Sequence, residues 1–300
     1  MSKGQGTASE LSPCRKGSCL SRYAGVVFTR IPCLLYLRRP MSSTDTQTII
    51  YEQPLNERIR ALLRLEHLLD SVEANLSAET GFACRTAIAG MLDITDLMGR
   101  FDIKAELVKE LERQSNAFSA LRQNPGVDPA RLQEVLDELN KQLTCLRDTH
   151  CQPGTELRRD ELLNSIRQRL AIPGGTCSFD LPGYHHWLHR AVRQRSTQLK
   201  TWFSDLAVIQ QGVHYALSLL RGSAAMQHKQ ASGGFYQQSS DPDQECQLVR
   251  ISLPQGSDYF PEISGGKHRF TVRFLHQPST GSRPVQSSDD VVFGLMCCNM

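Results

Sequence analysis

The sequence predicts an α+β protein, in which an N-terminal bundle of helices precedes a small, mainly antiparallel C-terminal β-sheet domain. Between about Pro54 and Met226, apolar residues recur at the three- and four-residue spacing of amphipathic helices. After Gly233 and Gly234 the pattern changes to the alternation that is typical of strands. Because short turns separate the long helical segments, we expect the helices to pack as a bundle.

The 300 residues are enough chain for one large or two moderate domains. We expect a helical domain over 53–228 and a strand domain over 229–298, the latter joined by a strand at 48–52. A lone strand before a helical region needs a partner for its backbone groups, which is why we place it in the sheet.

The first forty residues differ in charge from the rest of the chain. They carry seven Lys and Arg against one acid, whereas residues 41–300 carry 27 basic and 30 acidic residues. We predict that 1–46 is a disordered extension and that Met41 is the true initiator. The alternative is an organelle-targeting peptide, since the segment is rich in Arg and nearly free of acids. Its apolar run is too short and too interrupted to cross a membrane, and we expect no membrane insertion.

Capping residues mark the starts of several predicted helices. Ser77, Asp102 and Asp128 each precede an apolar stripe, and Pro129 occupies the first position of the helix after Asp128. The expected helices cover about 55–72, 77–98, 102–121, 129–146, 158–170, a segment around Trp202, and 208–220.

Four apolar runs in the last seventy residues predict strands of one small antiparallel sheet. They are CQLVRISL, YFPEIS, HRFTVRF and DVVFGLMCC, with Pro, Gly and Ser between them. The third run is unusual because it is basic. As a strand it places on one face Lys267, Arg269, Thr271 and Arg273, and on the other face His268, Phe270, Val272 and Phe274. It therefore predicts a half-buried strand that presents a row of cations to solvent.

No pattern for catalysis, metal binding or a cofactor accompanies this strand. The SGGK stretch lacks the spacing of a phosphate-binding loop. His185 and His189 are four residues apart, but no third metal ligand is evident near them. The cysteines form no framework of disulfide or zinc type. We therefore predict a protein that is not an enzyme and that has no catalytic residue, metal or cofactor.

Interaction proteins remain, in two classes. A row of cations on an otherwise acidic protein favours a local anionic partner, such as a peptide that carries carboxylates. The alternative is a nucleic-acid-binding regulator that uses the basic strand and the Arg190–Lys200 helix. Because the body of the chain is net acidic and no nucleic-acid-binding motif is present, we expect no nucleic acid.

Several sequence blocks together resemble the ZapD family of bacterial cell division accessory proteins. The blocks are IIYEQPLNERIRALLRLEHLL, KAELVKELERQ, RQRLAIPGGTCSFDLPGYHHWLH, GGFYQ and PEISGGKHRFTVRF. The resemblance extends from about Gln47 to Cys298, and residues 1–40 lie outside it.

The resemblance implies a cytoplasmic homodimer at the mid-cell division site. It implies that the protein binds the C-terminal tail of FtsZ through a basic pocket and bundles FtsZ filaments. Arg269 and Arg273 match the cations of that pocket, and Arg100 is a looser match. We add Lys267 and His268 as rim residues. Because the sheet carries the binding strand, we expect the dimer contact to come from the helical domain, with the apolar stripes of 128–146 and 208–220 as candidates.

Overall fold

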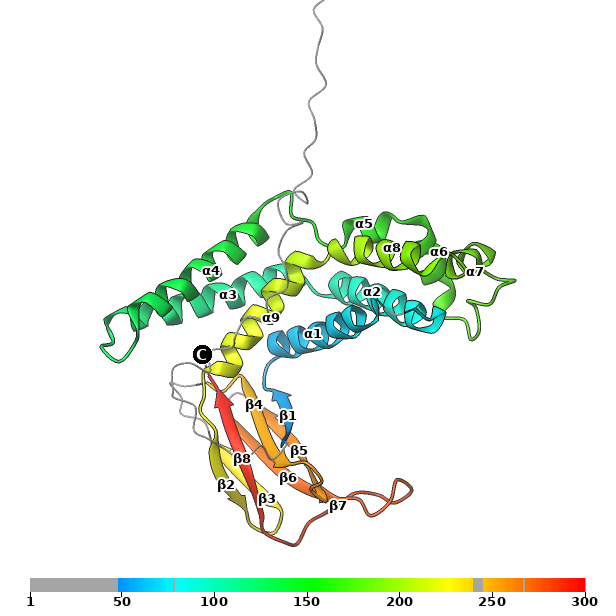
Figure 1. The fold of residues 1–300 in the computed structure, drawn as a ribbon. Coiled ribbons are helices and arrows are strands. Elements are labelled where there is room, and N and C mark those ends of the chain that lie inside the picture. Colours follow the sequence, from blue (N-terminus) through cyan, green and yellow to red (C-terminus); the bar gives the residue numbers. More distant parts are fainter. Residues whose placement is uncertain (1–47, 78, 240–244, 267, 300) are drawn as a thin grey trace, which may run out of the picture.

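The computed structural model describes residues 48–77, 79–239, 245–266 and 268–299. Helices form one part of the molecule, and strands form a compact layered body below them (Figure 1). The predicted α+β class is confirmed. The extension predicted for 1–46 lies outside the described residues.

Nine α-helices occur in the described part of the chain. They are α1 (Glu57–Asn75), α2 (Gly81–Arg100), α3 (Ile103–Ala120), α4 (Pro129–Arg147), α5 (Thr155–Arg159), α6 (Glu161–Leu170), α7 (Pro182–Leu188), α8 (Val192–Ser204) and α9 (Ala207–Gly222). Figure 1 shows α3 and α4 extending to one side and α2 and α5 to α8 extending to the other. Helix α9 runs from their meeting point toward the strands.

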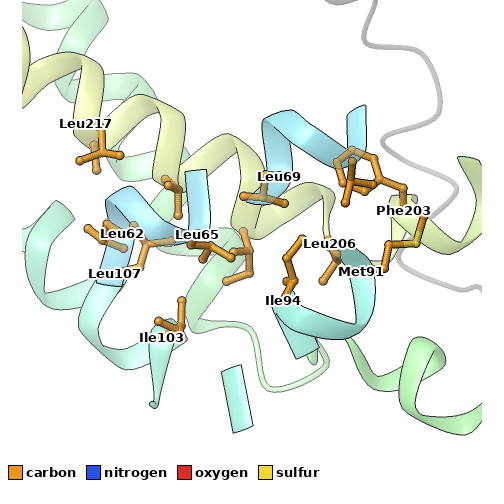
Figure 2. Close-up of a cluster of buried hydrophobic side chains, with 14 of the residues drawn as sticks. Leu62, Leu65, Leu69, Met91, Ile94, Ile103, Leu107, Phe203, Leu206 and Leu217 are labelled. Carbon is orange, nitrogen blue, oxygen red and sulfur yellow. The ribbon is translucent and has the colours of Figure 1, made fainter. Parts of the chain in front are cut away.

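The helices share one apolar core. Figure 2 shows Leu62, Leu65 and Leu69 of α1 beside residues of α2, α3 and α9, and all three are fully buried. The amphipathic stripes that predicted the helices are therefore the surfaces by which they pack, and burial of this apolar surface drives the packing.

Two of the three predicted helix caps are confirmed. The Asp102 carboxylate accepts a hydrogen bond from the backbone N–H of Ala105 at 3.0 Å, and the Asp128 carboxylate accepts one from Ala130 at 2.9 Å. Pro129 is the first residue of α4, as predicted. Each side chain pairs an N–H that the first turn of a helix would otherwise leave without a partner.

The predicted cap at Ser77 is wrong, because α2 begins three residues later. Its cap is Thr80, whose hydroxyl accepts from the backbone N–H of Ala83 at 3.2 Å. Helix α8 explains the shift, since Ser196 donates to the carbonyl of Leu76 at 3.0 Å and Arg195 to that of Glu79 at 2.8 Å. These contacts occupy the carbonyl groups of Leu76 and Glu79, which an uninterrupted helix would use for its own hydrogen bonds.

The helix predicted over 158–170 is two helices, separated at Asp160. The Asp160 carboxylate caps α6 by accepting from the N–H of Leu163 at 3.0 Å, and its other oxygen accepts from the indole N–H of Trp202 at 2.9 Å. The local sequence pattern allows Asp160 inside a helix, but its contact with Trp202 of α8 selects the capping conformation instead.

The strands form two antiparallel sheets within the described residues, so the single sheet that the sequence predicted is wrong. The first sheet has the order β1 (Thr48–Pro54), β4 (Leu248–Pro254), β8 (Val291–Cys298), β2 (Gln227–Ala231). The second has the order β3 (Phe235–Ser239), β6 (Arg269–His276), β5 (Tyr259–Gly266), with β7 (Val285–Gln286) also paired to β6. The early strand β1 pairs with β4 along its whole length.

The two sheets pack face to face around a second apolar core. Val249 and Ile251 of β4 meet Phe270 and Val272 of β6 there, and all four are fully buried. The turn between β2 and β3 takes the chain from one sheet to the other. Gly234 in that turn has φ +68°, and a Cβ there would lie 2.6 Å from the carbonyl oxygen of Ser287, so this position requires glycine.

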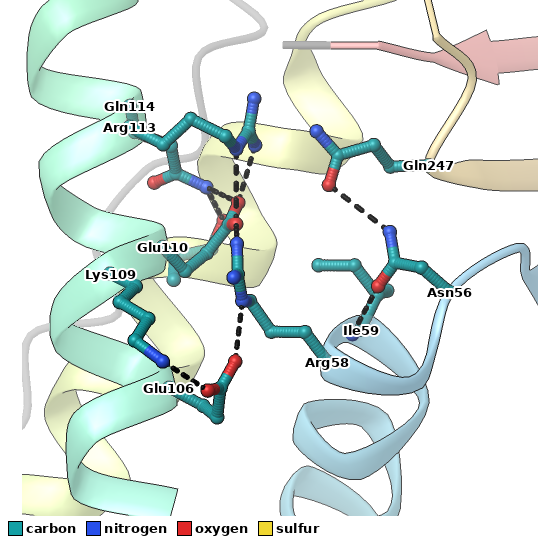
Figure 3. A network of polar contacts seen from close by, with 10 residues as sticks. Asn56, Arg58, Ile59, Glu106, Lys109, Glu110, Arg113, Gln114 and Gln247 are labelled. Carbon is teal, nitrogen blue, oxygen red and sulfur yellow. Dashed lines mark hydrogen bonds and ion pairs between the residues drawn. The ribbon is translucent and has the colours of Figure 1, made fainter.

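Apolar and polar contacts join the sandwich to the helices. Leu248 of β4 and Met296 of β8 point away from the sandwich and are buried in the helical core. Asn56 caps α1 and donates to the side chain of Gln247, just before β4, at 3.3 Å (Figure 3). Figure 3 also shows Arg58 of α1 bonded to Glu106 of α3 at 2.8 Å.

Four charged residues complete this junction. The guanidinium of Arg221, near the end of α9, donates to both oxygens of Glu52 on β1 and to both oxygens of Glu66 on α1, over 2.6–2.8 Å. Arg250 of β4 donates to Glu52 at 2.7 Å. The network therefore holds two helices and two strands at one point.

The two helical stripes predicted as dimer contacts are used inside the chain. Residues of both stripes are buried in the helical core, among them Leu136, Leu139, Val213 and Leu217. Neither stripe is free to meet a second copy without opening that core. A dimer contact therefore requires another surface.

Candidate functional site

Strand β6 has the two faces that the alternation predicted. Phe270, Val272 and Phe274 are fully buried in the sandwich core. Arg269 and Arg273 point outward and are exposed, and Thr271 between them is half-buried. The second sheet therefore has an open outer face with cations on its central strand.

The register of the sheet defines this outer face, which we call the basic face, as three rows across β3, β6 and β5. The rows are Phe235–Arg273–Glu262, Gln237–Thr271–Ser264 and Ser239–Arg269–Gly266. Side chains directly opposite one another in neighbouring strands lie about 5 Å apart at Cβ and interact. Long side chains such as arginine also reach diagonal neighbours in the next row.

The two arginines have different partners on this face. Arg273 forms an ion pair and a hydrogen bond with the Glu262 carboxylate, its row neighbour on β5. Arg269 donates to the neutral side-chain oxygen of Gln237 on β3 at 2.5 Å. The charge of Arg273 is therefore neutralised locally, whereas Arg269 has an uncharged hydrogen-bond acceptor.

The turn between β5 and β6 corrects one prediction. His268 was placed on the apolar face by parity, but β6 begins at Arg269, and His268 lies in the turn and is exposed. Lys267 lies outside the described residues. Gly265 lies close to β6, where a Cβ would be 2.5 Å from the Cα of Phe270, so this glycine of the SGGK stretch permits close strand pairing.

Arg100 belongs to a different feature of the molecule. It is the last residue of α2, is exposed, and lines a cleft of about 890 Å³ that also contains Arg60 and Arg64 of α1. Residues of β1, α1 and α2 line this cleft together with Phe101, and none comes from β5 or β6. The structure therefore does not place Arg100 on the basic face.

The segment proposed for nucleic-acid binding, 190–200, has three exposed cations, Arg190, Arg193 and Lys200, and one buried cation. Arg195 of α8 is buried and donates to the carbonyls of Glu79 at 2.8 Å and Arg190 at 3.1 Å. Figure 1 places α8 in the arm of helices above the strands, so α8 and β6 do not form one continuous basic surface.

In the described ranges, no group of three or more His, Cys, Asp or Glu side chains is arranged to hold a metal ion. His189 instead has its ring nitrogen Nδ1 2.8 Å from the carbonyl oxygen of His185. None of the helices in these ranges combines the length and the apolar character that a membrane span needs.

Sequence reasoning missed two residues of the basic face, Glu262 and Gln237. Glu262 is the one charged residue of β5, in a run that was treated only as a short edge strand. Gln237 could be recognised as a neighbour of Arg269 only from the register, because 32 residues separate them.

The fold is of the α+β class, in which a bundle of helices supports a sandwich with an open cationic face. Comparisons with known proteins identify the family. A model described as "ZapD: Cell division protein" matches residues 63–273. The chain is 42% identical to the cell division protein ZapD of Methylococcus capsulatus over 250 residues, which are 83% of this chain and 98% of that protein.

Two further relatives have the same description. The ZapD of Cupriavidus pinatubonensis is 39% identical over 84% of this chain and 99% of its own length. That of Enterobacter sp. is 36% identical over 83% of this chain and 98% of its own length. The chain therefore belongs to the ZapD family of non-enzymatic cell division proteins.

Proposed function

We propose that this protein binds the C-terminal tail of FtsZ on the basic face and, as a homodimer, cross-links FtsZ filaments at the division site. Membership of a cell division family supports the biological setting. The observation that carries the binding proposal is the pair of exposed arginines, Arg269 and Arg273, on the central strand of an open sheet.

Guanidinium groups suit such a tail because they bind carboxylates through two parallel N–H···O bonds. Residues four apart on one strand are separated by about 14 Å at the backbone. An extended peptide with two separated acidic groups can therefore engage both arginines at once. We propose Lys267 and His268 as secondary contacts of the same tail, and Arg100 as a separate contact in its own cleft.

Cross-linking requires two tail sites on one particle. A monomer with one site can only coat a filament, whereas a two-fold dimer presents two equivalent sites. Filaments display many tails, so paired sites gain avidity of about 10²–10⁴ over a single contact. A dimer therefore bundles filaments even when each tail contact is weak.

The direct test is co-sedimentation of the purified protein with FtsZ and GTP. We expect bundles to pellet with full-length FtsZ and not with FtsZ that lacks its C-terminal tail, and pelleting to decrease as salt rises. A DNA mobility-shift assay under the same conditions tests the alternative. Binding to DNA with no dependence on the FtsZ tail would contradict the proposal.

Mixed dimers test the cross-linking mechanism without knowledge of the interface. Parent chains and Arg269→Glu/Arg273→Glu chains are co-expressed with different tags, and the particle that carries both tags is purified. We expect its mass to be about twice 33.6 kDa. We also expect it to bind a tail peptide at one site and to fail to bundle filaments in light scattering. Bundling equal to that of the parent dimer would instead require a second FtsZ site on each chain.

A further inference from the structure

The two arginines of the basic face differ in their availability to a ligand. Arg269 has a neutral acceptor, the side-chain oxygen of Gln237. Arg273 has a carboxylate, Glu262, in the same row of the sheet. Among the described residues Arg269 contacts no carboxylate, so a ligand carboxylate can bind it directly, but at Arg273 it must displace an acidic side chain of the protein itself.

We propose that Glu262 is an internal competitor for the ligand carboxylate, so that Arg269 is the anchor of the basic face and Arg273 is a second contact gated by Glu262. This inference rests on the proposed function, because it concerns the acidic peptide that this face binds. It assigns to Glu262 the role of limiting the affinity of the basic face for the peptide, a role that neither arginine has.

Because the Arg273–Glu262 pair is exposed, displacing Glu262 from Arg273 costs little free energy. The two side chains are 52% and 51% exposed, so water solvates both groups when the pair opens. Exposed ion pairs of this kind shift equilibria by only about two- to fivefold. Glu262 therefore weakens the second contact without abolishing it, which suits a site whose strength comes from many simultaneous contacts.

The geometry of the rows also specifies the ligand. The proposed partner is an extended peptide with one acidic group at Arg269 and another about four residues away at Arg273. Phe235, 43% exposed, lies beside Arg273 and offers an apolar contact next to the second acidic group. The middle row offers the hydroxyl groups of Thr271 and Ser264. A peptide with a single acidic group should engage Arg269 and gain nothing from removal of Glu262.

Glu262→Gln tests the competition, with Asp258→Asn as its matched control. Asp258 is exposed just before β5, and its loss changes the net charge equally without freeing an arginine. The probe is a fluorescein-labelled peptide of the FtsZ C-terminal tail, and its dissociation constant is measured by anisotropy. We expect Glu262→Gln to bind about two- to fivefold more tightly than the parent and Asp258→Asn to bind almost as the parent does.

Repeating Glu262→Gln in an Arg273→Gln background separates a local effect from a general one. If Glu262 competes for Arg273, the gain disappears when Arg273 is absent. Three results would overturn the inference, provided that the parent binds the peptide. Glu262→Gln could give the same gain in affinity with and without Arg273, Asp258→Asn could give as large a gain, or Glu262→Gln could give none. Failure of the parent itself to bind the peptide would instead contradict the proposed function.

Discussion

Replacing Arg221 with Leu is expected to lower the free energy of unfolding by about 3 kcal/mol, because it removes one partner of a partly buried charge network. The side chain of Arg221 is 23% exposed, and the side chains of its two partners, Glu52 and Glu66, are 20% and 16% exposed. Without it these like charges face each other, and only Arg250 remains beside Glu52. Urea unfolding followed by circular dichroism measures the loss.

A surface pair provides the control for this variant. Arg159 and Glu156 on α5 form an ion pair in which the side chains are 72% and 66% exposed, so Arg159→Leu should change the stability by less than about 0.5 kcal/mol. Adding Glu66→Gln to Arg221→Leu should restore part of the loss, because one of the uncompensated charges is removed. Equal effects of Arg221→Leu and Arg159→Leu would show that the network does not stabilise the junction.

The same network should make the free energy of unfolding decrease at acid pH. Burial raises the pKa of Glu52, but the hydrogen bonds and charges of Arg221 and Arg250 outweigh burial and hold this pKa below its ordinary value of 4.5. As the pH falls below about 4.5, the unfolded chain therefore takes up this proton first, and the stability that the Glu52 carboxylate contributes is lost. Removal of Arg221 should make the loss of stability below this pH less steep.

The periodic signals predicted the long helices and the strands β4, β5, β6 and β8, because each reports a face that must be buried, but they did not predict β2, β3 or β7. The alternation in β6 identified Phe270, Val272 and Phe274 as core, and all three are fully buried. The helix boundaries at Thr80 and Asp160 could not be found in this way. They depend on hydrogen bonds from Arg195 and Trp202 of α8, which are distant in the sequence.

The sequence did not predict the two-sheet organisation or the role of Glu262 on the basic face, for a related reason. Alternation shows that a strand has a buried face, but it does not show which other strand covers that face. The division into two sheets depends on the packing of strands that are distant in the sequence, which brings Val249 and Phe270 into one core. Similarly, the arginine pair was evident from the sequence, whereas the neutralisation of Arg273 by Glu262 depends on the register of β5 against β6.

Reversing the charge of both arginines, Arg269→Glu with Arg273→Glu, is expected to weaken binding of the FtsZ tail peptide by far more than tenfold. Charge-assisted hydrogen bonds contribute about 1.5–3 kcal/mol each, and reversal adds repulsion to their loss. Both side chains point to solvent, so the fold should persist. The new Glu at 273 faces Glu262 across the sheet, which costs at most about 1 kcal/mol of stability. Peptide anisotropy and thermal unfolding measure the two effects.

A second double variant decides whether this loss belongs to the basic face or to net charge. Arg122→Glu with Arg159→Glu makes the same change in charge at two exposed positions of the helical part. Interactions between exposed charges are screened over about 8 Å at physiological ionic strength, so distant reversals should weaken binding only slightly at that salt concentration. We therefore expect near-parental affinity from this control and a loss of binding from the variant on β6. Equal weakening by both would assign the attraction to the overall charge of the protein and remove the basic face as the site.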